Sequence, residues 1–361
     1  MVVSKQLQIF FDFLRFCIGS AKEIPDSLKE ADWKELYRIA QKQCLVGVLF
    51  DGIKKLPAEH VGMKKELLLQ WMAESQMLEK ANARLNVAAI QVSEWFRKKG
   101  FRTCILKGQG NALMYPNPYS RTPGDIDIWV EGGDKRVISF VRSISPHEKA
   151  CYHHIDFPSY KGVEVEVHYR PSFLLCFWHN RKLQKYYERV KEEQFSHWVM
   201  LGAKGEIAIP TAEFNLIFQL THIFSHLMNE GIGLRQLLDY YYVLISDDLL
   251  LIRDRVQKEL KELGLWKFAG AIMYIMQEVF GMPASRLIVP PNEKYGRFVL
   301  NEVLEAGNFG KHDARNRFGR SQLGHNLQRV YRDIRLVRYF PAEALCEPLF
   351  RFWHFFWRKW H

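Results

Sequence analysis

The residues best suited to catalysis or metal binding are two aspartates separated by a single residue. They are Asp125 and Asp127, in Arg121-Thr-Pro-Gly-Asp-Ile-Asp. Side chains alternate along a strand with a period of two, so both carboxylates would project from one face while Ile126 and Ile128 point to a core. Close carboxylates repel unless a cation lies between them, and oxygen donors suit Mg²⁺, whose coordination substrate phosphates complete. The motif predicts a magnesium site or, taken alone, the polar end of a surface strand.

The segment before the acidic pair favours the metal site. Residues 102–106 have the composition of a short buried strand, Lys107-Gly108 that of its exit turn, and residues 109–115 that of a short helix. A glycine turn lets the backbone approach a phosphate, and amides at a helix start add partial positive charge. Lys107 and Arg121 would supply full charges, although either alone would more simply be solvated surface.

A third acidic residue would complete such a metal site. Residues 162–169 alternate strictly and predict a strand after a hairpin turn, with Glu164, Glu166 and His168 on one face. A solvated strand face would give the same pattern. The opposite strand carries further residues that line a cleft or face water: His153, His154 and Asp156.

Together these residues resemble the DNA polymerase β-like nucleotidyltransferase superfamily, whose signature is a strand, a glycine turn, a short helix and Asp-x-Asp on the next strand. The closest resemblance is to a mostly uncharacterised bacterial branch with Leu-Lys-Gly at the turn and an arginine before Asp-Ile-Asp. Lys107-Gly108, Arg121 and Asp125-Ile-Asp127 match it. Gly108-Gln109 departs from the Gly-Ser of other members, so no serine contacts phosphate there.

The resemblance implies a role for each residue. Asp125, Asp127 and Glu166 would be the catalytic carboxylates and metal ligands, with Glu166 also the general base because the family carries an acid two positions before a histidine. His168 would support them, and Glu164 is the alternative third acid. The expected nucleotide-binding residues at the turn and loop are Lys107, Gly108 and Arg121.

A second group of candidates lies in a helix predicted over 212–229. His222 and His226 are one turn apart, a spacing that can bind zinc, but Ile223 replaces the glutamate of a metalloprotease helix. Core or cleft-lining histidines are the simpler interpretation. Arg235 and Asp239 follow at helical spacing and could form an ordinary ion pair; by the resemblance, His222, Arg235 and Asp239 would bind nucleotide or acceptor.

The implied activity is transfer of a nucleoside monophosphate from an NTP to an acceptor hydroxyl, with Mg²⁺ or Mn²⁺ as cofactor and pyrophosphate as product. The acceptor could be a small molecule, a sugar phosphate, a protein or an RNA end. Two alternatives remain: a non-catalytic nucleotide-binding or protein-interaction module that retains the fold, and an enzyme that modifies RNA ends.

The helices and strands expected to position these residues indicate an α+β protein. Its small mixed sheet would be flanked by N-terminal helices and a C-terminal helical bundle. We expect an N-terminal helical region at 1–100, a nucleotidyltransferase core at 101–208 and a C-terminal helical domain at 209–361. Helices are predicted at 3–18, 31–55, 63–99, 109–115, 133–143, 179–193, 212–229, 234–262, 266–279, 296–306 and 322–338, and strands at 102–106, 125–130, 152–157 and 163–168.

Composition fits an enzyme with sizeable cores: 361 residues, 48% hydrophobic and 25% charged. The six cysteines include no Cys-x-x-Cys pair, which predicts small core residues in a reducing compartment rather than a structural zinc site. No apolar run approaches the roughly 20 residues that span a bilayer. We therefore expect a cytoplasmic protein without integral membrane association; the oligomeric state stays open.

The formal net charge of +11 is concentrated at the C-terminus, where residues 311–361 hold eleven Lys and Arg against four Asp and Glu. The final segment, 351–361, is aromatic nearly all round. A nucleic-acid surface, a membrane-surface anchor and a terminal helix docked on the bundle compete as interpretations. The docked helix is favoured because no nucleic-acid motif accompanies the charge.

Overall fold

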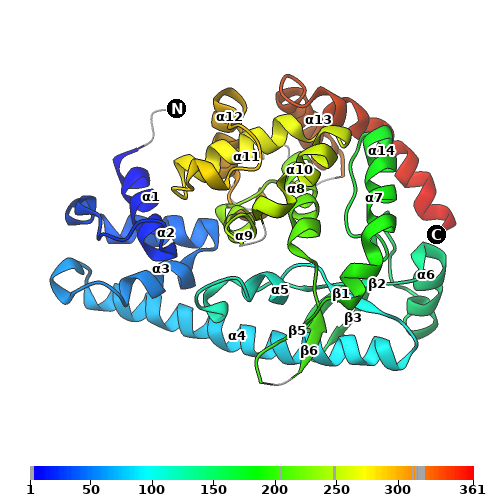
Figure 1. Cartoon of the computed structure of the whole chain (residues 1–361), viewed down its shortest axis with the longest axis horizontal. Helices are drawn as coiled ribbons and strands as arrows, with labels where there is room; N and C mark the ends of the chain where they lie inside the picture. Colours follow the sequence, from blue (N-terminus) through cyan, green and yellow to red (C-terminus); the bar gives the residue numbers. More distant parts are fainter. Residues whose placement is uncertain (1–3, 204, 247–248, 311–312, 314, 316–321) are drawn as a thin grey trace.

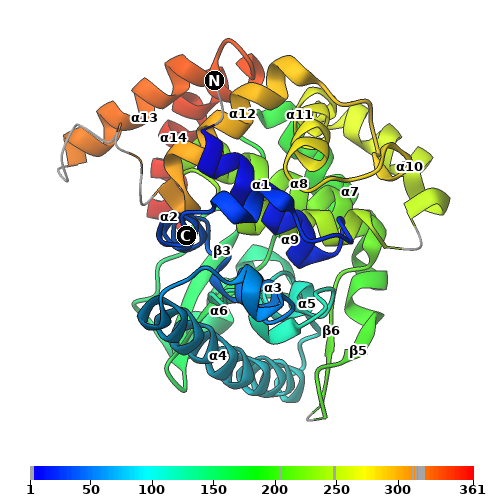
Figure 2. The ribbon, with the colours of Figure 1, turned by 90° about the vertical axis from the view of Figure 1, so that its left-hand side faces the viewer.

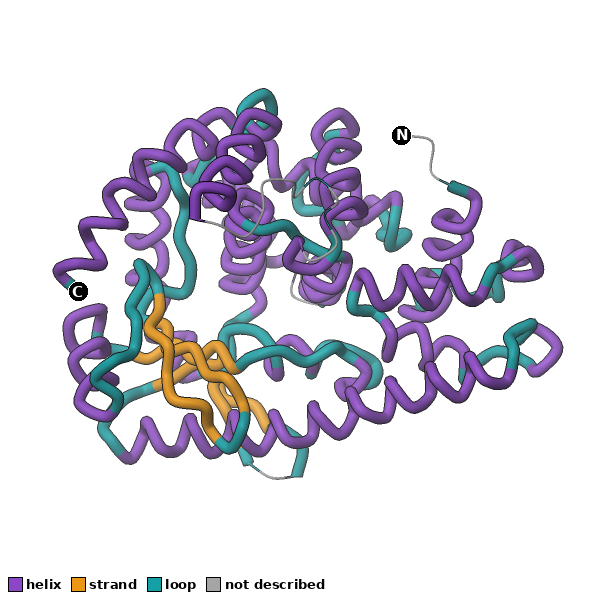
Figure 3. The backbone as a smooth tube through the Cα atoms, turned by 180° about the vertical axis from the view of Figure 1, so that it is seen from behind, coloured by secondary structure: helices purple, strands orange, loops and turns teal. Residues whose placement is uncertain are grey.

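The computed structural model describes residues 4–361 except 204, 247–248, 311–312, 314 and 316–321. A small mixed sheet lies at one corner of the molecule and helices form the rest (Figure 1). Seen from behind, the strands gather above one end of a long helix, with the other helices stacked over them (Figure 3). The α+β class expected from the sequence is confirmed.

The N-terminal region is helical, as predicted. The expected single helix over 31–55 is wrong, however, because Cys44 adopts a left-handed conformation (φ 56°) that ends one helix before the next begins. The bounds are α1 Lys5–Ile18, α2 Trp33–Gln43, α3 Val46–Ile53 and α4 Lys65–Lys98. The last helix of this N-terminal region, α4, runs the length of the molecule below the sheet (Figures 1 and 2).

The central sheet has the order β1-β2-β4-β3, with β2 and β4 parallel and the outer strands antiparallel to their neighbours. Its strands are β1 Thr103–Ile105, β2 Ile126–Val130, β3 His154–Tyr160 and β4 Val163–His168. The predicted hairpin turn is present, with positive φ at Lys161 and Gly162. The register sets Asp127 directly beside Glu166.

Two predictions around the sheet need correction. The helix expected over 109–115 is a single turn, α5 Gln109–Ala112, because Tyr115 precedes Pro116 and a residue before proline disfavours helical geometry. A second sheet was missed: the three-residue strands β5 Trp198–Met200 and β6 Glu206–Ala208 form a hairpin too short to show a periodic pattern. The adjacent helices are α6 Gly133–Ile144 and α7 Phe177–Ser196.

The C-terminal region is a helical bundle, as expected. The helix predicted over 234–262 is two helices, and residues 247–248 between them lie outside the described residues. The bounds are α8 Ala212–Asn229, α9 Leu234–Leu244, α10 Leu249–Glu262, α11 Trp266–Glu278, α12 Glu293–Ala306, α13 Gln322–Leu336 and α14 Pro341–Trp360. Short 3₁₀ turns occupy Asp26–Glu30, Ala58–His60, Pro118–Ser120, Ala284–Arg286 and Asn308–Gly310.

The two faces of β2 pack against different parts of the protein. Ile126, Ile128 and Val130 are buried in an apolar cluster with side chains of α4 and α6. On the other face, Trp129 packs on Phe195 of α7, their ring centroids 4.6 Å apart. Because side chains alternate, Asp127 shares the face of Trp129 and is directed toward the C-terminal helices. The acidic face therefore meets the helical bundle.

A second apolar core joins side chains of α1 to α3 with those of the C-terminal bundle, so the first and last predicted regions share buried surface. The boundaries at 100 and 208 remain a prediction. The terminal helix docks through its first half, where Glu343, Ala344, Glu347 and Phe350 are buried. The docking favoured for the aromatic segment 351–361 is wrong in this respect: none of its residues is buried, and most of its aromatic side chains are exposed, because the helix projects past the bundle. Among the described residues, none of the helices combines the length and apolar composition needed to cross a membrane.

Candidate active site

Three carboxylates meet where β2 and β4 run side by side. Asp125 immediately precedes β2, Asp127 lies within it, and Glu166 is the register partner of Asp127 on β4. One carboxylate oxygen from each residue lies within 4.8 Å of the other two. Glu164 is exposed two residues earlier on β4 and belongs to no such group among the described residues. The geometry thus places Glu166, and not Glu164, beside the aspartates.

The electrostatics of the aspartate pair are asymmetric. Repulsion from Asp127, followed by burial, raises the pKa of Asp125 to about 6. Burial would also raise the pKa of Asp127, but Lys107 and His168 outweigh it and hold that pKa well below its usual range. Asp127 is therefore the anchored anion, and Asp125 carries repulsion that a bound cation would relieve.

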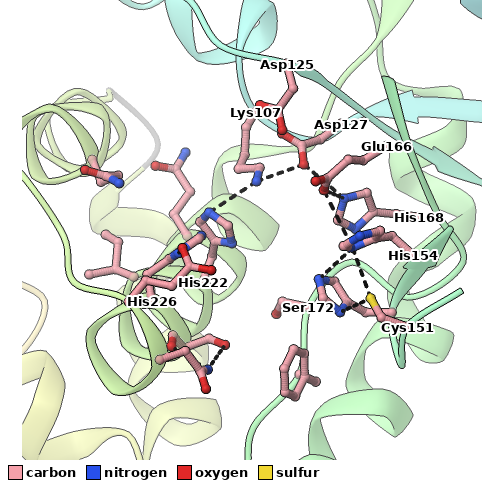
Figure 4. A pocket seen from close by; sticks show the side chains of 18 of the residues that line it. Lys107, Asp125, Asp127, Cys151, His154, Glu166, His168, Ser172, His222 and His226 are labelled. Carbon is pink, nitrogen blue, oxygen red and sulfur yellow. Dashed lines mark hydrogen bonds and ion pairs between the residues drawn. The ribbon is translucent and has the colours of Figure 1, made fainter. Parts of the chain in front are cut away.

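Lys107 is the positive charge of the cluster. Its ammonium lies 2.9 Å from Oδ1 of Asp127 and 3.2 Å from Nε2 of His222 on α8, so it bridges the sheet and the bundle (Figure 4). Burial lowers the pKa of Lys107, but Asp127, Asp125 and Glu166 together hold it above its usual value. Burial and then Lys107 lower the pKa of His222 well below its usual value, so His222 is a neutral acceptor here.

The turn after β1 brings the chain close to the carboxylates. Gly108 has a φ of 51°, which side chains rarely tolerate, and an added Cβ would lie 3.5 Å from the carbonyl oxygen of Asp125. A glycine is therefore required by the backbone conformation. The following helix α5 has only four residues, so the phosphate-binding contribution expected from a helix start rests on a single turn.

Arg121 lies deeper than the sequence suggested. Its Nε and Nη2 each donate to a different carboxylate oxygen of Asp239 at 2.8 Å, and the Tyr115 hydroxyl donates to Oδ1 of Asp239 at 2.7 Å. The side chains of Arg121 and Asp239 are 4% and 7% exposed. Arg235 donates to the carbonyl of Thr122 at 3.1 Å. Asp239 of α9 therefore fixes the loop that leads into β2.

Histidines of β3 and β4 and a cysteine just before β3 extend the site. His168 Nε2 lies 2.9 Å from Oδ1 of Asp127 and 3.4 Å from Oε2 of Glu166, which fits its expected supporting position. His154 Nδ1 lies 3.6 Å from the same oxygen of Glu166 and 3.4 Å from Sγ of Cys151 (Figure 4). A continuous polar chain therefore runs from Asp127 to Cys151.

A cavity of about 480 Å³ joins these groups, a size typical of small-ligand sites. The sheet supplies one wall and α8 and α9 the other, and α14 closes one side with Glu347, Phe350, Arg351 and His354. All nine predicted site residues line it: Lys107, Gly108, Arg121, Asp125, Asp127, Glu166, His222, Arg235 and Asp239.

Several cavity residues escaped sequence reasoning. Cys151 was interpreted as a core cysteine, yet it is half-buried and lines the cavity. Its signal was the sequence Cys151-Tyr-His-His, three donor side chains within four residues. Ser172 and Gln219 carried no recognisable signal, and neither did the α14 side chains, because long-range packing alone brings them to the cavity.

Comparison with known proteins gives one informative match. Residues 29–281 match the family model described as "Uncharacterised nucleotidyltransferase". No curated protein matches. The solved structures include an antigenic nucleotidyltransferase-like protein from Paracoccidioides brasiliensis that is 14% identical, covering 50% of this chain and 92% of that one. Its TM-score of 0.28 is too low to support an argument. The family match covers most of the sequence, including all nine predicted site residues, and the chain belongs to this nucleotidyltransferase family.

Proposed function

We propose that this protein transfers a nucleoside monophosphate from a nucleoside triphosphate to an acceptor hydroxyl and releases pyrophosphate. The observation that carries the proposal is the meeting of Asp125, Asp127 and Glu166 within 4.8 Å on the wall of a cavity. Membership of a nucleotidyltransferase family supports the reaction class.

The donor set fits Mg²⁺ or Mn²⁺, because carboxylate oxygens are the ligands these cations prefer. The raised pKa of Asp125 fits too, since it reflects repulsion from Asp127 with no full compensation. Asp125 and Asp127 would hold both cations, and Glu166 would complete the site nearer the acceptor. Bound there, the cations would neutralise phosphate charge and activate the attacking hydroxyl.

The chain's own groups would carry out the rest of the reaction. The acceptor oxygen attacks the α-phosphorus, the bond from that phosphorus to the bridging oxygen of pyrophosphate breaks, and Glu166 takes the proton of the hydroxyl. Lys107, which lies beside Asp127, would bind the triphosphate, and Gly108 allows the backbone to approach it.

Arg121 is better suited to positioning than to direct phosphate binding, because its Nε and Nη2 both donate to the carboxylate of Asp239. We propose that this pair holds the loop before β2 so that both aspartates keep their orientation. His222 and Arg235 reach the cavity from α8 and α9 and would contact the nucleotide or the acceptor.

The test uses the purified full-length protein with each α-labelled NTP, Mg²⁺ or Mn²⁺, and cell extract as a source of acceptors. We expect label to move to one acceptor class, which size and sensitivity to nuclease or protease identify, and Asp125→Asn with Asp127→Asn to abolish the transfer. NTP binding should also weaken strongly without the cation. A wild-type protein that binds NTP but transfers no label from any of the four nucleotides would instead indicate a non-catalytic binding module.

A further inference from the structure

A thiol and two imidazoles converge on the cavity wall beside the carboxylates. Cys151 and His153 lie just before β3, and His154 begins it. Sγ of Cys151 lies 3.5 Å from Nδ1 of His153 and 3.4 Å from Nδ1 of His154, and the latter nitrogen lies 3.1 Å from Nε2 of His153. With one donor atom from each residue, all three lie within 4.8 Å of one another.

The donor types select a cation different from Mg²⁺. Thiolate and imidazole ligands suit zinc and related soft cations, whereas Mg²⁺ takes oxygen ligands. Zinc binds sulfur at about 2.3 Å and nitrogen at about 2.0 to 2.1 Å, so ligand atoms of a tetrahedral site lie roughly 3.3 to 3.6 Å apart. The distances from Sγ of Cys151 to Nδ1 of His154 (3.4 Å) and to Nδ1 of His153 (3.5 Å) are close to these values. The 3.1 Å contact with His154 uses the other nitrogen of His153, so one donor atom of His153 makes only one of these two contacts, and all three donors still lie within 4.8 Å of one another.

His154 is oriented as a metal-binding histidine usually is. Its Nδ1 faces the thiol, while its Nε2 lies 3.7 Å from Oδ1 of Asp156 on the opposite side of the ring. A ligating imidazole commonly gives its second N–H to a carboxylate, which fixes the ring and raises its basicity. Asp156 is positioned for that role.

The cluster is open on the side of the cavity. Cys151, His153 and His154 all line it, and structural zinc sites instead close the metal with four protein ligands. Glu166 lies between this cluster and the aspartates, with Oε2 3.6 Å from Nδ1 of His154. A cation held by the three donors would therefore present its fourth position to water or to a ligand in the same cavity.

We propose that Cys151, His153 and His154 form a binding site for a zinc-like divalent cation, next to the carboxylate site and with its fourth position facing the cavity. The site follows from the donor set and its geometry, and it does not depend on nucleotidyl transfer. This site replaces the interpretation of Cys151 as a core cysteine.

Cobalt titration of the chelator-treated, full-length protein tests the site, because thiolate bound to Co²⁺ gives a charge-transfer absorption that oxygen ligands do not give. We expect saturation at one equivalent, displacement by Zn²⁺, and loss of the band in Cys151→Ser. Cys44→Ser, a half-buried cysteine at the end of α2, should keep it. So should the double variant Asp125→Asn with Asp127→Asn, which separates this site from the carboxylate site.

Two further variants keep the test decisive if Cys151→Ser misfolds. His154→Gln should weaken cobalt binding at least about tenfold, and Asp156→Asn about 10- to 100-fold, with the band retained at saturation. Absence of the thiolate band from the wild type, or its persistence in Cys151→Ser, would overturn the proposal. Label transfer is measured separately, so a protein inactive in that assay would still give a clear cobalt result.

Discussion

At the scale of single residues, the cavity contains charged side chains that lower the stability of the folded protein unless an opposite charge lies beside them. Asp125 shows this most clearly, because Asp127 and burial raise its pKa to about 6. The folded protein therefore binds a proton at Asp125 more tightly than the unfolded chain does. Without metal, this costs stability progressively as pH rises from about 4 to above 6, and the cost is constant at higher pH.

We expect Asp125→Asn to stabilise the metal-free protein at pH values above 6, by on the order of 1 to 3 kcal/mol, because it removes the repelling charge. At about pH 2 to 3 the difference should nearly vanish, since this lies below the ordinary pKa of an aspartate and Asp125 is then protonated in both states. Thermal unfolding of Asp125→Asn and of the wild type, in the presence of a chelator and across this pH range, measures the difference in stability. Asp156→Asn is the control, because the neighbouring imidazole of His154 lowers the pKa of Asp156, so that variant should not stabilise the protein at any of these pH values. Equal melting of Asp125→Asn and wild type above pH 6 would contradict the assignment.

The buried pair of Arg121 and Asp239 gives a second prediction. Asp239→Ala leaves the guanidinium buried without its carboxylate, which should cost about 3 to 5 kcal/mol. Replacing both partners, Arg121→Met with Asp239→Leu, should recover part of that loss, because the guanidinium of Arg121 is no longer buried without its carboxylate, while the buried Arg235 still loses Asp239 as a neighbouring charge. Urea unfolding compares the stability of the wild type, Asp239→Ala and the double variant. Glu188→Ala, at an exposed position, is the control and should leave stability unchanged. A single variant as stable as this control would show that the pair does not fix the loop.

At the scale of elements, the site depends on how α4 holds the loop before β2. The side-chain amide of Asn82 donates to the carbonyls of Tyr119 at 2.9 Å and of Arg121 at 2.7 Å. Both bonds attach the loop to the long helix below the sheet. The loop in turn sets where Asp125 leads into β2.

Asn82→Ala should therefore destabilise the protein by about 1 to 3 kcal/mol, because it leaves buried carbonyls without a donor. We also expect lower transfer activity, because the loop loses its attachment to α4. Arg84→Ala, an exposed position on the same helix, is the matched control and should change stability by no more than about 0.5 kcal/mol. If urea unfolding gives the two variants the same stability, the attachment is unimportant.

Elements with a clear period could be predicted from the sequence, and irregular ones could not. The alternation around Glu166 and the spacing of Asp125 and Asp127 predicted the two strands that carry them, whereas the family resemblance selected Glu166 over Glu164. The pairing of these strands is known only from the structure. The break at Cys44 depends on one left-handed residue, and β5 and β6 are three residues each. A single left-handed residue and strands of three residues leave no periodic hydrophobic pattern in a window of ten or more residues.

At the scale of the whole molecule, the cavity forms because the bundle folds back over the acidic face of the sheet. Contacts between residues far apart in the sequence close it: Lys107 with His222, Arg121 with Asp239, and the backbone amides of Leu175 and Cys176 with Glu343 of α14. Residue types could suggest the members of this site. Their pairing depends on tertiary packing, which is why the sequence suggested a phosphate contact for Arg121 and no role in the cavity for α14.

The central claim is that Glu166 is the base and third carboxylate of a nucleotidyl transfer site. Its most direct test measures NTP binding and label transfer together for wild type, Glu166→Gln and Glu164→Gln. We expect Glu166→Gln to reduce transfer at least about 100-fold while NTP binding changes little, because the lost base acts mainly in the transition state. Glu164→Gln removes a charge from the same strand face two residues away and should retain transfer. Equal transfer by Glu166→Gln and wild type, or loss of transfer in Glu164→Gln alone, would contradict the account.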